Sequence, residues 1–165
     1  MLDRIKRFFG KAAKGVIQDS QRKTEHDILV AVCALFLEMA RIDGTFTPRE
    51  TDTILTILKE KYGLSPQHAE DLVTEAQKEL DDSVDLWQFS YLINENYSEE
   101  EKQEIIEILW RIVFIDGHMD RYEHYLMRKL RNLLRVSQDQ LIAAKLKVLE
   151  KNRKSPGEKN NSGEI

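Results

Sequence analysis

Two acidic loops carry the side chains that could do chemistry in this chain. The pattern Asp-Gly-x-apolar-x-x-x-Glu runs from Asp43 to Glu50 and again from Asp116 to Glu123. Carboxylate oxygens grouped in this way are ligands that hard divalent cations prefer. The same pattern has a purely structural explanation, because a glycine can end one helix while a glutamate helps to cap the next. The sequence leaves both interpretations open.

The interval from glycine to glutamate equals that between the sixth and twelfth positions of an EF-hand calcium loop. The first and third positions would then be Met39 and Arg41 in one loop and Ile112 and Phe114 in the other, and none of these is a suitable oxygen donor. A complete calcium cage is therefore excluded. We predict at most a weakly bound divalent cation, Ca²⁺ or Mg²⁺, that keeps several waters and whose ligands come from Asp43, Glu50, Asp116, Asp120 and Glu123.

Catalysis has less support from the residues than binding has. The chain holds no phosphate-cradling glycine loop, no paired cysteine ligands, no His-Glu-x-x-His motif and no nucleophile elbow. His26, His68 and His124 lack a second histidine at metal-binding spacing, so we expect them at the surface or near helix caps. We predict that the protein is not an enzyme. Metal-assisted hydrolysis stays an alternative for the cluster of Asp116, His118, Asp120 and Glu123.

The elements that must position these loops are helices. Apolar residues recur at helical spacing in segments 25–42 and 48–62, which flank the first loop, and Thr47-Pro48 with Glu50 forms a capping pattern. The helix over 48–62 is expected to end at Gly63. Further helices are expected over 66–80, over about 86–93 with Trp87 packing inward, and after Ser98, which forms a capping pattern with Glu101. Two more are expected after Asp120 and from about 138 to 149, the last with Leu141, Ala144, Leu146 and Leu149 as its apolar positions. The fold class is therefore all-α, with about seven helices.

The chain also repeats itself. A shift of 73 residues superposes the two Asp-Gly loops and brings together the apolar positions before them, as in Val32 with Ile105, Phe36 with Leu109 and Met39 with Ile112. Removing one residue near Gly63 then places Leu64-Ser65 against Val136-Ser137. The pattern predicts two helix-loop-helix halves that pack about a pseudo-twofold axis.

The paired motifs resemble those of the TerB-like family of bacterial tellurite-resistance and stress-response proteins. The first copy runs from Ala40-Arg41-Ile42-Asp43-Gly44 to Glu50, and the second from Val113-Phe114-Ile115-Asp116-Gly117 to Glu123, with isoleucine before each aspartate where the family commonly has alanine. The resemblance covers about residues 25–149. It implies an all-helical protein in the cytoplasm or at the inner face of the membrane. It further implies an acidic surface that binds divalent metal and partner proteins, and no enzymatic activity.

Charge divides the chain into three parts. Residues 1–24 and 151–165 are basic, whereas residues 25–150 hold 14 basic and 25 acidic side chains, a net charge of −11. We therefore predict a basic N-terminal segment over 1–24, a TerB-like domain over 25–150 and a disordered tail over 151–165. The acidic domain would repel a phosphate backbone, so we expect cations or a basic protein as partners and no nucleic acid.

The N-terminal residues 1–17 form an amphipathic pattern, with Leu2, Ile5, Phe8 and Phe9 among basic side chains. This segment could dock on its own domain or lie on an anionic membrane. A membrane-peripheral adaptor anchored by this segment, with structural loops, is therefore the alternative function. Cys33, the one cysteine, lies on an apolar helix face where we expect inert burial. No segment is a secretory signal or a membrane span, so we expect a cytoplasmic protein.

Overall fold

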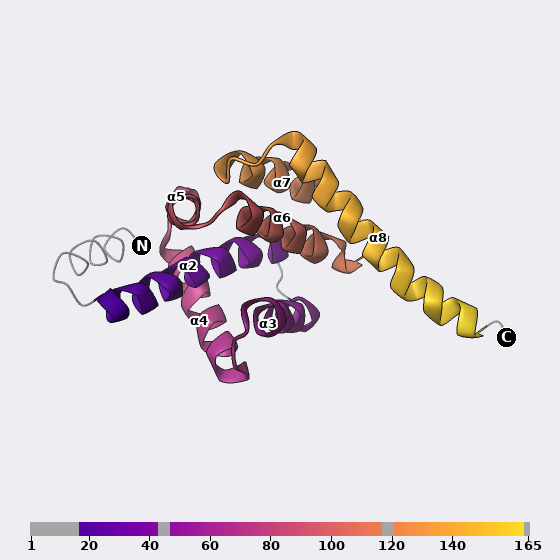
Figure 1. Ribbon diagram of the computed structural model, residues 1–165, viewed down its shortest axis with the longest axis horizontal. Helices are drawn as coiled ribbons and strands as arrows, with labels where there is room; N and C mark the ends of the chain where they lie inside the picture. Colours follow the sequence, from indigo (N-terminus) through magenta and orange to yellow (C-terminus); the bar gives the residue numbers. More distant parts are fainter. Residues whose placement is uncertain (1–16, 43–46, 117–120, 164–165) are drawn as a thin grey trace.

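The computed structural model describes residues 17–42, 47–116 and 121–163, and the side chains of residues 22–42, 47–115 and 121–153. All regular elements in these ranges are helices, which confirms the all-α fold class (Figure 1). In chain order they are α2 (Ile17–Ala40), α3 (Pro48–Tyr62), α4 (Pro66–Asp82), α5 (Trp87–Asn96), α6 (Glu99–Val113), the 3₁₀ turn η1 (Phe114–Asp116), α7 (Arg121–Leu133) and α8 (Gln138–Gly163).

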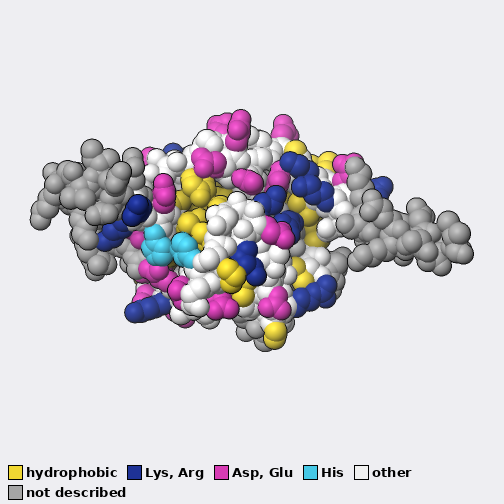
Figure 2. All heavy atoms as spheres, turned by 60° about the horizontal axis from the view of Figure 1, so that its bottom comes forward, with side chains coloured by type: hydrophobic (Ala, Val, Ile, Leu, Met, Phe, Trp, Pro, Cys, Tyr) yellow, Lys and Arg dark blue, Asp and Glu magenta, His cyan; other side chains and the backbone are white. Residues whose placement is uncertain are grey.

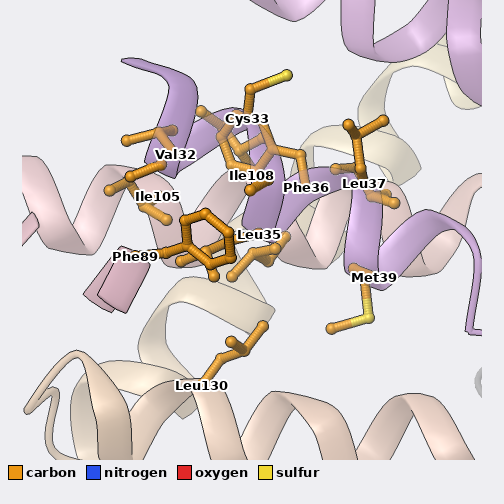
Figure 3. Packing of buried hydrophobic residues seen from close by; sticks show 14 of the residues in the cluster. Val32, Cys33, Leu35, Phe36, Leu37, Met39, Phe89, Ile105, Ile108 and Leu130 are labelled. Carbon is orange, nitrogen blue, oxygen red and sulfur yellow. The ribbon is translucent and has the colours of Figure 1, made fainter. Parts of the chain in front are cut away.

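Helices α2 and α6 form the centre of the fold. They pack against each other and run in the same direction, so that Val32 lies beside Ile105 and Phe36 beside Ile108 (Figure 3). All four side chains are buried. Burial of a broad apolar stripe on both helices removes much apolar surface from water, which is the main stabilising contribution to such a core.

The remaining helices surround this pair in a repeated order. Helix α4 packs on α2 in the first half, and α8 packs on α6 in the second, while α3 and α7 follow the two central helices. Helix α5, which has no counterpart, also packs on α2. The arrangement agrees with the duplication that the sequence predicts.

The repeat extends to backbone conformation at the ends of α3 and α7. Gly63 follows α3 with φ of 67°, and Arg135, one residue before the matching Val136-Ser137, has φ of 58°. After both residues a serine caps the next helix, since Ser65 Oγ accepts from His68 N at 3.1 Å and Ser137 Oγ accepts from Gln140 N at 3.1 Å. The two halves thus share a left-handed residue and a serine cap.

Two helices are longer than the sequence indicates. Helix α2 begins at Ile17 instead of near Glu25, because residues 17–24 contain no glycine or proline to stop it. Helix α8 extends to Gly163 and therefore includes most of residues 151–165, for which composition predicts disorder. Val148 is the last buried residue among the side chains described. The division of the chain at residue 150 stays a prediction.

Three apolar side chains of the predicted helices are exposed, and one of them, Trp87, was expected to pack inward. Trp87 is 53% exposed and stacks on Tyr91 at 5.1 Å between ring centroids. Leu146 and Leu149 are 60% and 37% exposed, because α8 turns Leu141, Ala144 and Val148 towards α6 instead. Periodicity over a short apolar-rich helix did not identify the buried side.

The two left-handed positions give a matched stability test. We expect Gly63→Ala to destabilise the protein by about 1 kcal/mol, because alanine resists positive φ. Nothing lies within 4 Å of the added Cβ, so the loss of stability measures the backbone strain at positive φ without any steric clash. We expect Arg135→Gly to be neutral or to stabilise the protein by up to about 1 kcal/mol. Urea denaturation would measure both, and a loss of stability in Arg135→Gly with none in Gly63→Ala would contradict the assignment.

Candidate functional site at the Asp-Gly loops

The helices before the two loops end on the same side of the domain. Because α2 and α6 are parallel neighbours, their C-terminal ends lie together, with Ile42 leading into the first loop and η1 leading into the second (Figure 1). A helix C-terminus carries about half a negative charge from its unsatisfied carbonyl groups. Two such helix ends side by side favour the binding of a cation near them.

The end of the first loop is built as a helix cap. Thr47 Oγ1 accepts a hydrogen bond from Glu50 N at 3.2 Å and donates one to Glu50 Oε1 at 2.9 Å. Glu50 is buried, with 7% of its surface exposed. These are the contacts that a purely structural, helix-capping role of the loop predicts. They hold the Glu50 carboxylate close to the N-terminus of α3.

A basic side chain before the first loop is already engaged elsewhere. Arg41 Nη1 donates to Asp81 Oδ1 at 2.7 Å, and Arg41 Nε lies 3.5 Å from Glu38 Oε1. Burial alone would lower the pKa of Arg41, but the hydrogen bond to Asp81 and the charges of Glu38 and Asp81 outweigh it and raise the pKa. Arg41 therefore ties α2 to α4 and stays charged.

The second loop starts from a different local structure. Helix α6 tightens into η1 over Phe114–Asp116, and Phe114 stacks on Trp110 at 5.7 Å between ring centroids. Trp110 Nε1 in turn donates to the Leu141 carbonyl at 3.0 Å, which fixes this corner to α8. Beyond the loop, Glu123 lies in the first turn of α7 and is half-buried.

The structure describes only part of the predicted ligand set. Glu50 and Glu123 are described with their side chains, Asp116 only by its backbone, and Asp43, His118 and Asp120 lie outside the described residues. Among the residues that are described, no three His, Cys, Asp or Glu side chains form a group that could hold a metal ion. A site that uses the two loops therefore stays a prediction.

The structure joins two histidines that the sequence separates. His26 on α2 and His68 on α4 stack with ring centroids 6.1 Å apart, and His26 Nε2 lies 2.6 Å from Glu75 Oε2. Both rings lie at the surface, as expected, but they are not isolated, because α2 packs on α4. Figure 2 shows histidine and acidic side chains together on one face. No local signal indicated that His26 contacts His68, or that it contacts Glu75, which lies 49 residues away in the sequence.

An open groove of about 700 Å³ runs between α6 and α8. Acidic side chains line it near the start of α6, lysines line its other end, and Lys147 Nζ pairs with Glu107 Oε1 at 3.1 Å. Ala143 is its one apolar lining residue. The groove therefore lacks the enclosed apolar walls that surround small-molecule substrates in most enzymes.

The structure confirms that the thiol of Cys33 is buried. It lies in the core beside α2's other apolar residues, and burial raises its pKa to about 12 (Figure 3). A thiol that stays protonated at neutral pH is a poor nucleophile.

Burial likewise raises the pKa of the Tyr97 hydroxyl to about 12, with a further contribution from the charge of Glu101.

These features define a class of protein: an all-helical domain of two related halves in which each central helix is followed in the sequence by an Asp-Gly pair. The family model of the tellurite resistance protein TerB matches residues 29–146. The chain therefore belongs to the TerB family, which confirms the resemblance seen in the paired motifs.

A crystal structure of a protein of unknown function from Porphyromonas gingivalis is similar in fold. The TM-score is 0.58 at 20% sequence identity, and the match covers 74% of this chain and 88% of that chain. At this identity the likeness supports the fold alone. A comparison with curated proteins gave no match. No helix in the described ranges is long and apolar enough to cross a membrane.

The cap at Thr47 can be tested separately from any ligand. We expect Thr47→Ala to lower the free energy of unfolding by about 1 kcal/mol, because Glu50 N loses its acceptor. Ser65→Ala at the start of α4 is the matched control cap and should cost a similar amount. Urea denaturation in the presence of chelator measures both. An unchanged stability in Thr47→Ala alone would show that the cap contributes nothing.

A second test concerns the thiol. We expect Cys33 not to react with a thiol reagent at pH 8 in the native protein and to react fully in denaturant, because burial keeps it protonated and inaccessible. Absorbance of the released chromophore follows the reaction. Fast labelling of the native protein would show that α2 opens readily.

Proposed function

We propose that this TerB-family domain is a non-catalytic binding module. Its two Asp-Gly loops take up a divalent cation, Ca²⁺ or Mg²⁺, and the surrounding acidic surface engages a basic surface of a partner protein. The residues proposed to hold the cation are Asp43, Glu50, Asp116, Asp120 and Glu123.

The observation that carries this proposal is the parallel packing of α2 on α6. It brings the ends of two helices together, each directly before an aspartate and a glycine. The negative ends of both helix dipoles and the carboxylates of both loops then act on the same region. Arg41 does not neutralise this region, since Asp81 and Glu38 hold its guanidinium.

Composition supports a cationic ligand. Residues 25–120, which include the first loop and the second loop as far as Asp120, contain 22 acidic and 7 basic side chains, a net charge of −15. Carboxylates held close together repel one another, which raises the free energy of the empty loops. A bound cation removes this repulsion and so stabilises the folded state in proportion to its occupancy. The same field attracts basic protein surfaces.

The non-catalytic assignment rests on the chemistry of the side chains. The described cysteine is a buried thiol, and the groove between α6 and α8 is open and polar. Neither provides an activated nucleophile or an enclosed substrate pocket.

Calorimetry with Ca²⁺, Mg²⁺ and Mn²⁺ tests the cation site. We expect weak binding to the wild type and loss of most of the binding heat in Asp43→Asn/Asp116→Asn, because each substitution removes a charged oxygen ligand. The matched control is Asp71→Asn/Asp82→Asn, which removes the same charge from α4. Absence of binding heat in the wild type would leave only the capping role for the loops, and equal losses in both variants would indicate general charge screening.

A further inference from the structure

The two ends of the domain sequence have opposite charge. Residues 25–120 carry a net charge of −15, whereas residues 121–153 hold nine basic and three acidic side chains, a net charge of +6. The basic part consists of α7 and the described part of α8, which both pack on α6 (Figure 1). We call this pair the basic layer.

The outer face of α7 is basic and aromatic. Leu126, Met127 and Leu130 face the core, and the opposite side exposes Arg121, Tyr125 and Arg128, with Lys129 beside them. Tyr122 and Tyr125 are 67% and 68% exposed. In the described part of the chain, Arg121, Arg128 and Lys129 make no ion pair. Their charges are therefore available to an external anion.

The outer face of α8 is aliphatic. Ile142, Leu146 and Leu149 are 45%, 60% and 37% exposed and follow one another at intervals of four and three residues. This spacing places them on one stripe of the helix, opposite the buried Leu141, Ala144 and Val148. Arg153 continues the stripe at the next helical interval. A solvent-exposed aliphatic stripe costs free energy unless something covers it.

We propose that the basic layer is a docking surface for an anionic phospholipid membrane. The cations of α7 bind lipid phosphates, Tyr122 and Tyr125 lie at the headgroup level, and the α8 stripe enters the boundary of the acyl chains. Amphipathic helices bind membranes through this combination of aliphatic contact and electrostatic attraction. Exposed tyrosine is a favoured residue at such an interface.

Two other occupants fit less well. A nucleic acid would use the cations and tyrosines but leaves Ile142, Leu146 and Leu149 without a role. A second copy of the chain could cover the aliphatic stripe, but like charges on two basic layers would then face each other. A membrane uses both features at once.

The surface differs from the anchor that the N-terminal residues 1–17 suggest. It belongs to the folded domain, and it would fix the orientation of that domain on the lipid instead of only tethering it. The inference is independent of the cation proposal, since α7 and α8 contribute to it through Arg, Lys, Tyr and aliphatic side chains.

Co-sedimentation of the full chain with vesicles tests the proposal, in EDTA, using phosphatidylcholine with and without phosphatidylglycerol. We expect binding only to the anionic vesicles and weakening by added salt. Arg121→Gln/Arg128→Gln/Lys129→Gln should weaken binding roughly a hundredfold, since each of the three basic side chains at an anionic leaflet contributes on the order of a factor of five. Ile142→Gln/Leu146→Gln should weaken it several-fold while circular dichroism stays unchanged.

Two variants with the same loss of charge serve as controls. Arg49→Gln/Lys59→Gln/Lys78→Gln changes α3 and α4 and should bind like the wild type. Arg4→Gln/Arg7→Gln/Lys11→Gln changes the N-terminal segment and measures what that segment itself contributes to vesicle binding. The proposal is overturned if the wild type ignores anionic vesicles, if the α7 variant binds like the wild type, or if the α3–α4 control loses as much binding as the α7 variant. Binding of a DNA oligonucleotide without vesicle binding would reassign the surface to nucleic acid.

Discussion

The packing of α2 along α6 is the contact on which the rest of the structure depends. It buries Val32, Phe36, Ile105 and Ile108 at the centre of the domain and sets the two helices parallel. Because each half then adds its own pair of helices, every later element takes its place from this contact. The same contact sets the ends of α2 and α6 side by side, so the core and the candidate cation site have one origin.

Local sequence signals predicted most of the fold. Thr47 with Glu50, and Ser98 with Glu101, mark helix starts whose hydrogen bonds form as expected, and Gly63 marks a helix end. These signals act within four residues, so an isolated sequence shows them. The duplicated core positions were also recognisable, since each half repeats the same apolar spacing. The left-handed conformation of Arg135 was not predicted, because the surrounding turn imposes it and the residue type does not indicate it.

Features that depend on contacts between distant segments were not predicted. Nothing in the sequence near His26 or His68 indicates that they stack, because the crossing of α2 and α4 decides it. Which side of α5 and α8 faces inward also depends on tertiary packing. Trp87 was therefore placed inside and lies outside, and the apolar spacing of the last helix did not show that Leu146 and Leu149 are exposed. The charge of the domain was counted as a whole, which hid the separation of an acidic part from a basic layer. The predicted ligands of the two loops depend on residues beyond those described.

The opposite charges of the two parts determine how the domain is oriented towards a charged surface. An anionic surface attracts the +6 layer and repels residues 25–120, so both effects turn α7 and α8 towards it. One divalent cation changes a charge of −15 by only two, and screening limits its reach to about 8 Å at physiological salt. Cation binding therefore leaves most of the charge separation in place. Its direct electrostatic effect on the basic layer falls mainly on Arg121, which lies between the proposed ligands Asp120 and Glu123 in the sequence.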